Sequence, residues 1–341
     1  MNQLDHLFDQ FYQQAMEDSF QTAGPVERKY ALKQRLFELL GDFSHLDEHI
    51  RPLEATIIES KDFPEYTREY VHLPLTELVE VNMYILTPKN QQKKHPAALA
   101  LHGHGYGVKA IVGLTEDGEE DEENNDIHHH FAVQLAKRGI KVFAPEIIGF
   151  GKRRLSQDIE NGHPKSCEQM ASNLLVQGKT LAGLRIWEAK KLLGYIEQCQ
   201  DVKTDRTGIM GFSGGALVAA YTAALDHRIQ ATVLTGFVNT FKGSILAMRH
   251  CLDNYIPGML NVAEMPEWIS LIAPRPLFIE SGKDDHIFPV DTARQAIDEL
   301  ATYYENHAEN FAYDIFDGGH EVNGNRSFDW LANKLEASIT K

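Results

Sequence analysis

The chain has little cysteine, and the few cysteines it has follow no recognisable pattern. Its 341 residues include only three, Cys167, Cys199 and Cys251, which are widely spaced and odd in number. Disulfide frameworks and CxxC metal sites need paired or closely spaced cysteines. The sequence therefore predicts neither, and it favours a reducing compartment.

Long apolar runs are also missing. No stretch approaches the roughly 18 apolar residues that a membrane-spanning helix needs. The N-terminal segment MNQLDHLFDQFYQQAMEDSF carries acids where a signal peptide carries bases, and it has no apolar core. We therefore expect a cytoplasmic protein that does not associate with a membrane.

Basic residues are fewer than acidic residues in this chain. The chain has 33 Lys and Arg against 49 Asp and Glu, which gives a net charge of −16. Binding to nucleic acid needs a basic surface, so this charge argues against a nucleic-acid partner. It argues equally against an anionic membrane surface. Hydrophobic residues make up 43% of the chain, a typical share for a globular enzyme.

The N-terminal part of the chain is predicted to be helical. Residues 1–50 contain two runs with apolar residues at helical spacing, and Gly41 ends the second run. This stretch is too short for an independent domain, so we expect it to pack on the catalytic domain, residues 51–341. That domain is predicted to begin with two strands, near Ala55–Glu59 and Leu78–Leu86.

Short apolar runs then alternate with helical stretches. The clearest of these stretches, 182–196, carries one apolar stripe suited to packing on a sheet. Buried strands separated by helices are typical of a mostly parallel sheet covered on both faces. The sequence therefore predicts an α/β fold with a mostly parallel central sheet flanked by helices. The expected strands are Ala97–Leu101, Lys141–Ala144, Gly208–Met210, Ala231–Leu234, Pro276–Ile279 and Phe311–Phe316.

Two insertions interrupt this rhythm, at about 114–127 and 236–272. The first contains the acidic run 116–126, which we expect to form a solvated, mobile loop near the mouth of the active site. The second is rich in aromatic residues and methionine. It either covers the active site or packs against the N-terminal helices, because an exposed apolar patch would otherwise result.

The strongest chemical signal is the motif Gly-Phe-Ser-Gly-Gly at residues 211–215. It fits G-x-S-x-G between a predicted strand and an apolar helix, the context in which the motif presents a nucleophilic serine. The chain must reverse sharply at Ser213, and a Cβ at Gly211 or Gly215 would crowd the turn. The helix N-terminus would place the backbone N–H of Gly214 beside a developing oxyanion.

A serine nucleophile needs a base and an acid that orients it. In α/β hydrolases the order along the chain is nucleophile, acid, histidine, each in a loop after a strand. His320 follows the last predicted strand, which makes it the candidate base. The preceding strand is followed by two adjacent acids, Asp284 and Asp285, and Glu280 at the strand end is a third candidate. The residues alone leave these three open.

The loop His-Gly-His-Gly-Tyr-Gly at 102–107 follows the first strand of the parallel region. A second oxyanion donor is expected there, and the resulting candidate is the backbone N–H of His104. The alternation of His102 and His104, with three more histidines at 128–130, allows a metal site as an alternative. No acid–histidine cluster in the sequence completes a ligand set, so we expect no metal and no cofactor. The run 128–130 is expected to begin a helix, with one histidine packed and two solvated.

The sequence resembles the dienelactone-hydrolase-like α/β hydrolases, in particular the bacterial acetyl xylan esterase or cephalosporin deacetylase-like branch. In that family the acid lies in a G-x-x-D-x-x-x-P pattern. Gly282, Asp285 and Pro289 fill it here, so the resemblance implies Asp285. The matching stretches are HGHGYG (102–107), APEIIGFGKRR (144–154), DRTGIMGFSGGALVAAYTAALDHRI (205–229), RHCLDNYIPG (249–258), APRPLFIESGKDDHIFP (273–289) and DGGH (317–320).

The chain departs from these relatives at two positions. Dienelactone hydrolases proper use a cysteine nucleophile where this chain has Ser213, and the deacetylases carry tyrosine where it has His104. The resemblance implies a hydrolase of small carboxylic esters with short acyl groups. A serine peptidase of the prolyl-oligopeptidase-like type is one alternative. A non-catalytic binding protein that kept the fold is another, but it would not need serine, acid and histidine together.

Overall fold

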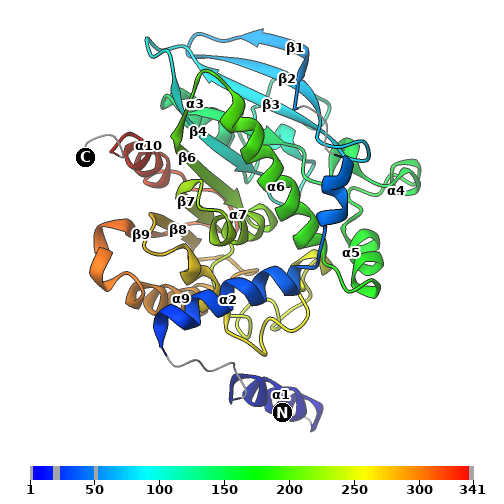
Figure 1. The fold of residues 1–341 in the computed structure, drawn as a ribbon, viewed down its shortest axis with the longest axis vertical. Coiled ribbons are helices and arrows are strands. Elements are labelled where there is room, and N and C mark those ends of the chain that lie inside the picture. Colours follow the sequence, from blue (N-terminus) through cyan, green and yellow to red (C-terminus); the bar gives the residue numbers. More distant parts are fainter. Residues whose placement is uncertain (1–2, 18–23, 50–52, 338–341) are drawn as a thin grey trace.

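The computed structural model describes residues 3–17, 24–49 and 53–337, and part of the predicted N-terminal extension lies outside these ranges. Its centre is one nine-stranded sheet with the order β1-β2-β3-β5-β4-β6-β7-β8-β9 (Figure 1). The first three strands and β5 pair antiparallel, and all pairings from β5 through β4 to β9 are parallel. The strands are β1 (Thr56–Asp62), β2 (Tyr66–Pro74), β3 (Glu80–Pro88), β4 (His95–Leu101), β5 (Lys141–Pro145), β6 (Val202–Phe212), β7 (Ile229–Thr235), β8 (Leu277–Gly282) and β9 (Phe311–Phe316).

Helices cover both faces of the sheet, as the buried strands require. Two large apolar clusters result, one with residues of α2, α6 and α7 and one with residues of α3 and α10. In β4, at the middle of the sheet, every residue is buried. The predicted mostly parallel α/β fold is therefore confirmed. The helices are α1 (Gln3–Glu17), α2 (Pro25–Leu40), α3 (Phe131–Lys137), α4 (Ser156–Glu160), α5 (Cys167–Val176), α6 (Leu181–Gln198), α7 (Gly214–Leu225), α8 (Met265–Ile269), α9 (Val290–Thr302) and α10 (Ser327–Ala337).

One strand was not predicted. β2 lies between the two strands expected before residue 90, and its burial alternates along most of its length. Arg68 occupies one of its buried positions and is only 4% exposed, because its guanidinium donates to the carbonyl of Val112 and pairs with Glu120. A buried, paired arginine hides the apolar alternation that identifies a strand in a sequence.

Most of the acidic run at 116–126 is exposed, as expected, but two of its acids tie it to the rest of the fold. Glu120 pairs with Arg68 and with Lys61 on β1. Asp121 contacts the imidazole of His130 at 2.7 Å. These pairs anchor the loop because one partner in each of two pairs, Arg68 and His130, is buried.

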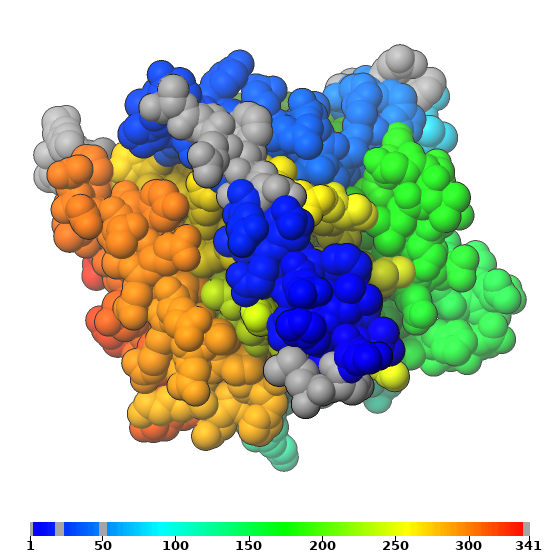
Figure 2. Space-filling view, turned by 90° about the horizontal axis from the view of Figure 1, so that it is seen from below, coloured from blue at the N-terminus to red at the C-terminus, as the bar shows by residue number. Residues whose placement is uncertain are grey.

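The two N-terminal helices lie differently on the body. α2 buries Leu32, Leu36 and Leu40 in the apolar cluster beside α6 and α7. None of the residues of α1 (Gln3–Glu17) is buried. Figure 2 shows α1 in dark blue, lying across the face next to the segment drawn in yellow. Polar contacts hold it there, such as that of Asp9 with Lys242, so α1 touches the 236–272 insertion.

Within the described ranges, no helix has both the length and the apolar character needed to cross a bilayer.

The contact between α2 and α6 can be tested with two glycines of the same helix. A Cβ on Gly183 would lie 2.2 Å from the carbonyl oxygen of Leu40, whereas one on Gly194 would meet nothing closer than 3.7 Å. We predict that Gly183→Ala lowers the free energy of unfolding by about 1–3 kcal/mol through overpacking. The control Gly194→Ala should be neutral or gain up to about 1 kcal/mol from helix propensity. Urea unfolding measures both, and equal stabilities would contradict the packing.

Candidate active site

Ser213 lies at the sharp junction of β6 and α7. Its backbone has φ 54° and ψ −120°, a strained conformation for a residue with a side chain. The neighbouring glycines allow the turn. A Cβ on Gly211 would lie 2.3 Å from the carbonyl oxygen of Gly215, and one on Gly215 would lie 2.2 Å from that of Leu101. Side chains at these two positions would therefore push α7 away from the sheet.

Two hydrogen bonds connect Ser213 with a histidine and an acid. The Oγ of Ser213 lies 2.9 Å from Nε2 of His320, and Nδ1 of His320 lies 2.8 Å from Oδ2 of Asp285. Asp285 follows β8 and His320 follows β9, so both loops lie at the carboxyl ends of parallel strands. Because a carboxylate can only accept, Nδ1 carries the proton and Nε2 is free to accept the proton of the serine hydroxyl.

Of the adjacent acids, only Asp285 contacts His320. Its second oxygen, Oδ1, accepts hydrogen bonds from the backbone N–H groups of Ile287 and Phe288, both at 2.8 Å. The Asp285 side chain is buried, so these donors and the imidazole fix its orientation. Asp284 is exposed.

The third candidate acid, Glu280, has other partners. Its carboxylate accepts hydrogen bonds from the hydroxyl of Thr235 and the backbone N–H of Gly324. It is 1% exposed, and this burial raises the pKa of Glu280. The hydrogen bonds of Glu280 thus connect β8 with β7 and with the segment after His320.

Two aromatic rings pack against the imidazole of His320. The ring of Phe212 lies 4.9 Å from it and the ring of Phe288 lies 5.7 Å from it, nearly parallel. Gly236 also lies close to the imidazole, since a Cβ there would lie 3.0 Å from Cε1 of His320. The insertion 236–272 therefore begins beside the histidine. Sequence reasoning missed the role of Phe288, which has no signal of its own in the chain.

The loop after β4 lies against the start of α7. The imidazole of His104 packs on Gly214, where a Cβ would come within 2.9 Å of Cε1. The backbone N–H of Gly103 donates to Nε2 of His128 at 3.1 Å. His102 uses both ring nitrogens locally: Nδ1 contacts the carbonyl of Gly103, and Nε2 accepts from the backbone N–H of Ile147. His102 and His104 consequently do not form a joint metal site.

The three consecutive histidines differ from their expected arrangement. They precede α3, which begins at Phe131, and two of them rather than one are buried. Nδ1 of His128 contacts Asp126, and burial lowers the pKa of His128. His129 is partly exposed and contacts Glu321 at 3.3 Å. The acids of the 116–126 run explain the difference, because they supply partners that make burial of His128 and His130 favourable.

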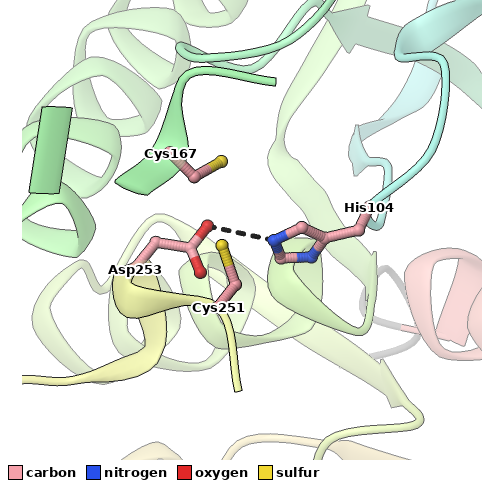
Figure 3. A group of neighbouring side chains, drawn as sticks. All are labelled: His104, Cys167, Cys251 and Asp253. Carbon is pink, nitrogen blue, oxygen red and sulfur yellow. Dashed lines mark ion pairs between the residues drawn. The ribbon is translucent and has the colours of Figure 1, made fainter. Parts of the chain in front are cut away.

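His104 belongs to a cluster that sequence reasoning missed. Its imidazole lies beside Cys167, Cys251 and Asp253, and these four residues could hold a metal ion (Figure 3). Burial lowers the pKa of His104, but its contacts with Asp253 and Cys251 outweigh this and raise it to about 9. Despite its own burial, Asp253 has a pKa held well below the usual range by Arg185 and His104. The four residues come from three segments that are distant in the sequence, so no local spacing could reveal the whole cluster.

The fold and this constellation define the class of the protein. A mostly parallel sheet with a serine on a strained strand–helix turn, and an acid and a histidine after its last two strands, is an α/β hydrolase. Residues 82–314 match the model of the dienelactone hydrolase family, and the chain belongs to that family.

Individual relatives agree with this assignment. YtaP of Bacillus subtilis (strain 168), whose name describes it only as a hydrolase, is 27% identical over 288 residues, which cover 83% of this chain and 90% of YtaP. A Bacteroides fragilis NCTC 9343 structure described as an acetyl xylan esterase is 18% identical with a TM-score of 0.66, covering 88% of this chain and 78% of its own. A glucuronoyl esterase from Solibacter usitatus is 13% identical with a TM-score of 0.64, covering 89% and 92%. These solved structures share the fold.

The two adjacent acids allow a matched test of the hydrogen bond to His320. We predict that Asp285→Asn lowers kcat by about four orders of magnitude, because an amide at this position favours the wrong tautomer of the histidine. Asp284→Asn should keep nearly full activity, since this side chain is exposed. Steady-state hydrolysis of a nitrophenyl ester measures both variants. Equal and small losses would mean that the orienting acid lies elsewhere.

Proposed function

We propose that this protein is a serine esterase that hydrolyses small carboxylic esters with short acyl groups through an acyl-enzyme on Ser213. The observation that carries the proposal is the pair of hydrogen bonds from Ser213 to His320 and from His320 to Asp285, at 2.9 and 2.8 Å. Nucleophile and base lie within reach for proton transfer, and a third group orients the base.

The reaction begins when the Oγ of Ser213 attacks the ester carbonyl. Nε2 of His320 takes the hydroxyl proton, and Asp285 stabilises the imidazolium that forms. His320 then gives the proton to the leaving alcohol. A water molecule attacks the acyl-enzyme in the second half, again with His320 as base, and this releases the acid. These steps need no cofactor.

Backbone N–H groups of Gly214 and His104 are proposed to stabilise the tetrahedral oxyanion. Gly214 is the first residue of α7, where N–H groups are free of helical partners and the helix dipole favours negative charge. The packing of His104 on Gly214 supports the second donor, since it holds the loop after β4 close to the serine. Two such donors aimed at one oxygen are worth several kcal/mol in the transition state.

The preference for short acyl groups rests on how enclosed the nucleophile is. Ser213 is only 8% exposed, and Phe288 and the start of the 236–272 insertion lie beside its base. Two aromatic residues of the insertion, Phe237 and Phe241, are buried in the apolar core, which anchors the start of the insertion beside His320. The names of the acetyl xylan esterases among the structural relatives agree with a small acyl group.

Removing the nucleophile tests the proposal directly. We predict that Ser213→Ala lowers kcat by about six orders of magnitude while the variant stays folded, since only an oxygen is lost. A fluorophosphonate probe should label the wild-type protein at Ser213 and leave the variant unlabelled. Labelling of both proteins, or a tenth of the activity retained in the variant, would assign the nucleophile to another residue. Absence of labelling in the wild type would favour a non-catalytic protein.

A series of nitrophenyl esters tests the size of the acyl pocket. We predict that kcat/KM falls from acetate or propionate towards octanoate, because an enclosed pocket rejects additional methylene groups by overpacking. An open groove would instead gain about 0.8 kcal/mol for each CH₂ buried. A rise in kcat/KM along the series would contradict the enclosed pocket and point to a lipase-like site.

A further inference from the structure

Three segments that are distant in the sequence meet at one cluster next to the active site, in which Cys167 and Asp253 are buried and His104 and Cys251 are half-buried. His104 lies in the loop after β4, Cys167 is the first residue of α5, and Cys251 and Asp253 lie in the 236–272 insertion. One ligand atom from each of the four lies within 4.8 Å of the others. Figure 3 shows the four side chains pointing toward a common centre. Both cysteines are free thiols.

The spacing of His104 and Asp253 resembles that of two ligands on one ion. Nε2 of His104 lies 3.3 Å from Oδ2 of Asp253. This nitrogen is buried, and no group among the described residues forms a hydrogen bond of good geometry with it. Ligand atoms about 2.1 Å from a tetrahedral zinc are separated by about 3.4 Å. The pair thus already has this spacing before any ion binds.

The charges around the cluster also suit a divalent cation. As metal ligands, two thiolates and a carboxylate carry three negative charges in a largely desolvated place, since Cys167 and Asp253 are buried. Arg185, which is 4% exposed, balances one of them through contacts with Oδ2 of Asp253 at 2.6 Å and Sγ of Cys167 at 3.1 Å. A divalent cation balances the other two. Hydrogen bonds from such an outer residue to the ligands are characteristic of metal sites.

We propose that His104, Cys167, Cys251 and Asp253 bind one Zn²⁺ ion. Two sulfurs, one imidazole nitrogen and one carboxylate oxygen are ligands that zinc accepts in tetrahedral geometry. The four protein ligands fill the coordination sphere and leave no position for water, which makes the site structural rather than catalytic. Binding releases the protons of the thiols and of His104. This site does not depend on the proposed esterase function.

The ion holds the surroundings of Ser213 together. It crosslinks the loop after β4, the start of α5 and the 236–272 insertion, and the first and last of these border the serine and His320. The proposal differs from the expectation of no metal, because its ligand set comes from distant segments rather than from the neighbouring histidines. Zinc affinity adds to the free energy of unfolding, since the unfolded chain has no such site.

Metal analysis of the purified full chain tests the proposal. The protein is prepared without a histidine tag or chelators, dialysed against Zn²⁺ and then against metal-free buffer, and assayed by mass spectrometry for metals. We expect about one zinc per chain, falling below about a tenth in Cys251→Ser and Cys167→Ser, because each removes one ligand. Cys199→Ser is the matched control, since Cys199 lies at the end of α6 outside the cluster, and it should keep its zinc.

A spectroscopic readout on the wild type covers the case in which a cysteine variant fails to fold. Co²⁺ in place of zinc should give the intense near-ultraviolet charge-transfer band of thiolate ligands. The chelator phenanthroline should lower Tm, and added Zn²⁺ should restore it. Wild-type protein with less than about a tenth of an equivalent of zinc and no cobalt–thiolate band would overturn the proposal. So would a Cys167–Cys251 disulfide found in the purified protein, or equal zinc contents in the Cys251→Ser and Cys199→Ser variants.

Discussion

The close approach of α7 to the carboxyl end of β4 is the contact on which the candidate site depends. Gly215 touches the carbonyl of Leu101 so closely that no side chain fits between them. This contact aims the N-terminus of α7 at the loop that carries His104, and it forces Ser213 into a strained backbone conformation that costs about 1–3 kcal/mol. Burial of nearly all of α7 in the sheet cluster offsets that cost.

Backbone hydrogen bonds at the carboxyl ends of the strands connect Ser213 across the sheet with the loops that carry Asp285 and His320. The N–H of Ser213 donates to the carbonyl of Thr235 at the end of β7, and the N–H of Gly236 donates to Glu280 in β8. The N–H of Lys283 in turn donates to Phe316 at the end of β9. The separations of Ser213, Asp285 and His320 therefore follow from the sheet register rather than from flexible loops, which is the precision that proton transfer requires.

The sequence was sufficient for features that depend on neighbouring residues. Apolar runs located the strands of the parallel region, and the glycines at 211 and 215 predicted the turn because they act on adjacent backbone. Neighbouring residues alone did not decide between Asp284 and Asp285 as the partner of His320. It depends on two backbone N–H groups that orient the carboxylate of Asp285, and these exist only once the loop has folded.

Features that depend on distant partners could not be predicted in the same way. β2 was missed because the burial of Arg68 depends on partners far along the chain, the carbonyl of Val112 and the carboxylate of Glu120. Only one histidine of the run 128–130 was expected to be buried, because the carboxylate partners of His128 and His130 could not be identified from the sequence. In each case the sequence shows a polar side chain, and only the three-dimensional partner decides whether burial is favourable.

Two histidines paired with aspartates position the loop after β4, His128 beside the loop and His104 within it. Nε2 of His128 accepts from the backbone N–H of Gly103, so this nitrogen carries no proton and Nδ1 must donate to Asp126. Burial lowers the pKa of His128, which keeps the ring neutral as this arrangement requires. Within the loop, His104 pairs with Asp253. Asp126 and Asp253 therefore have a structural role in addition to their contribution to the negative charge of the chain. Asp126 selects the tautomer of His128, and Asp253 fixes the position of His104. Through these two histidines, the aspartates hold the loop that is proposed to supply an oxyanion donor.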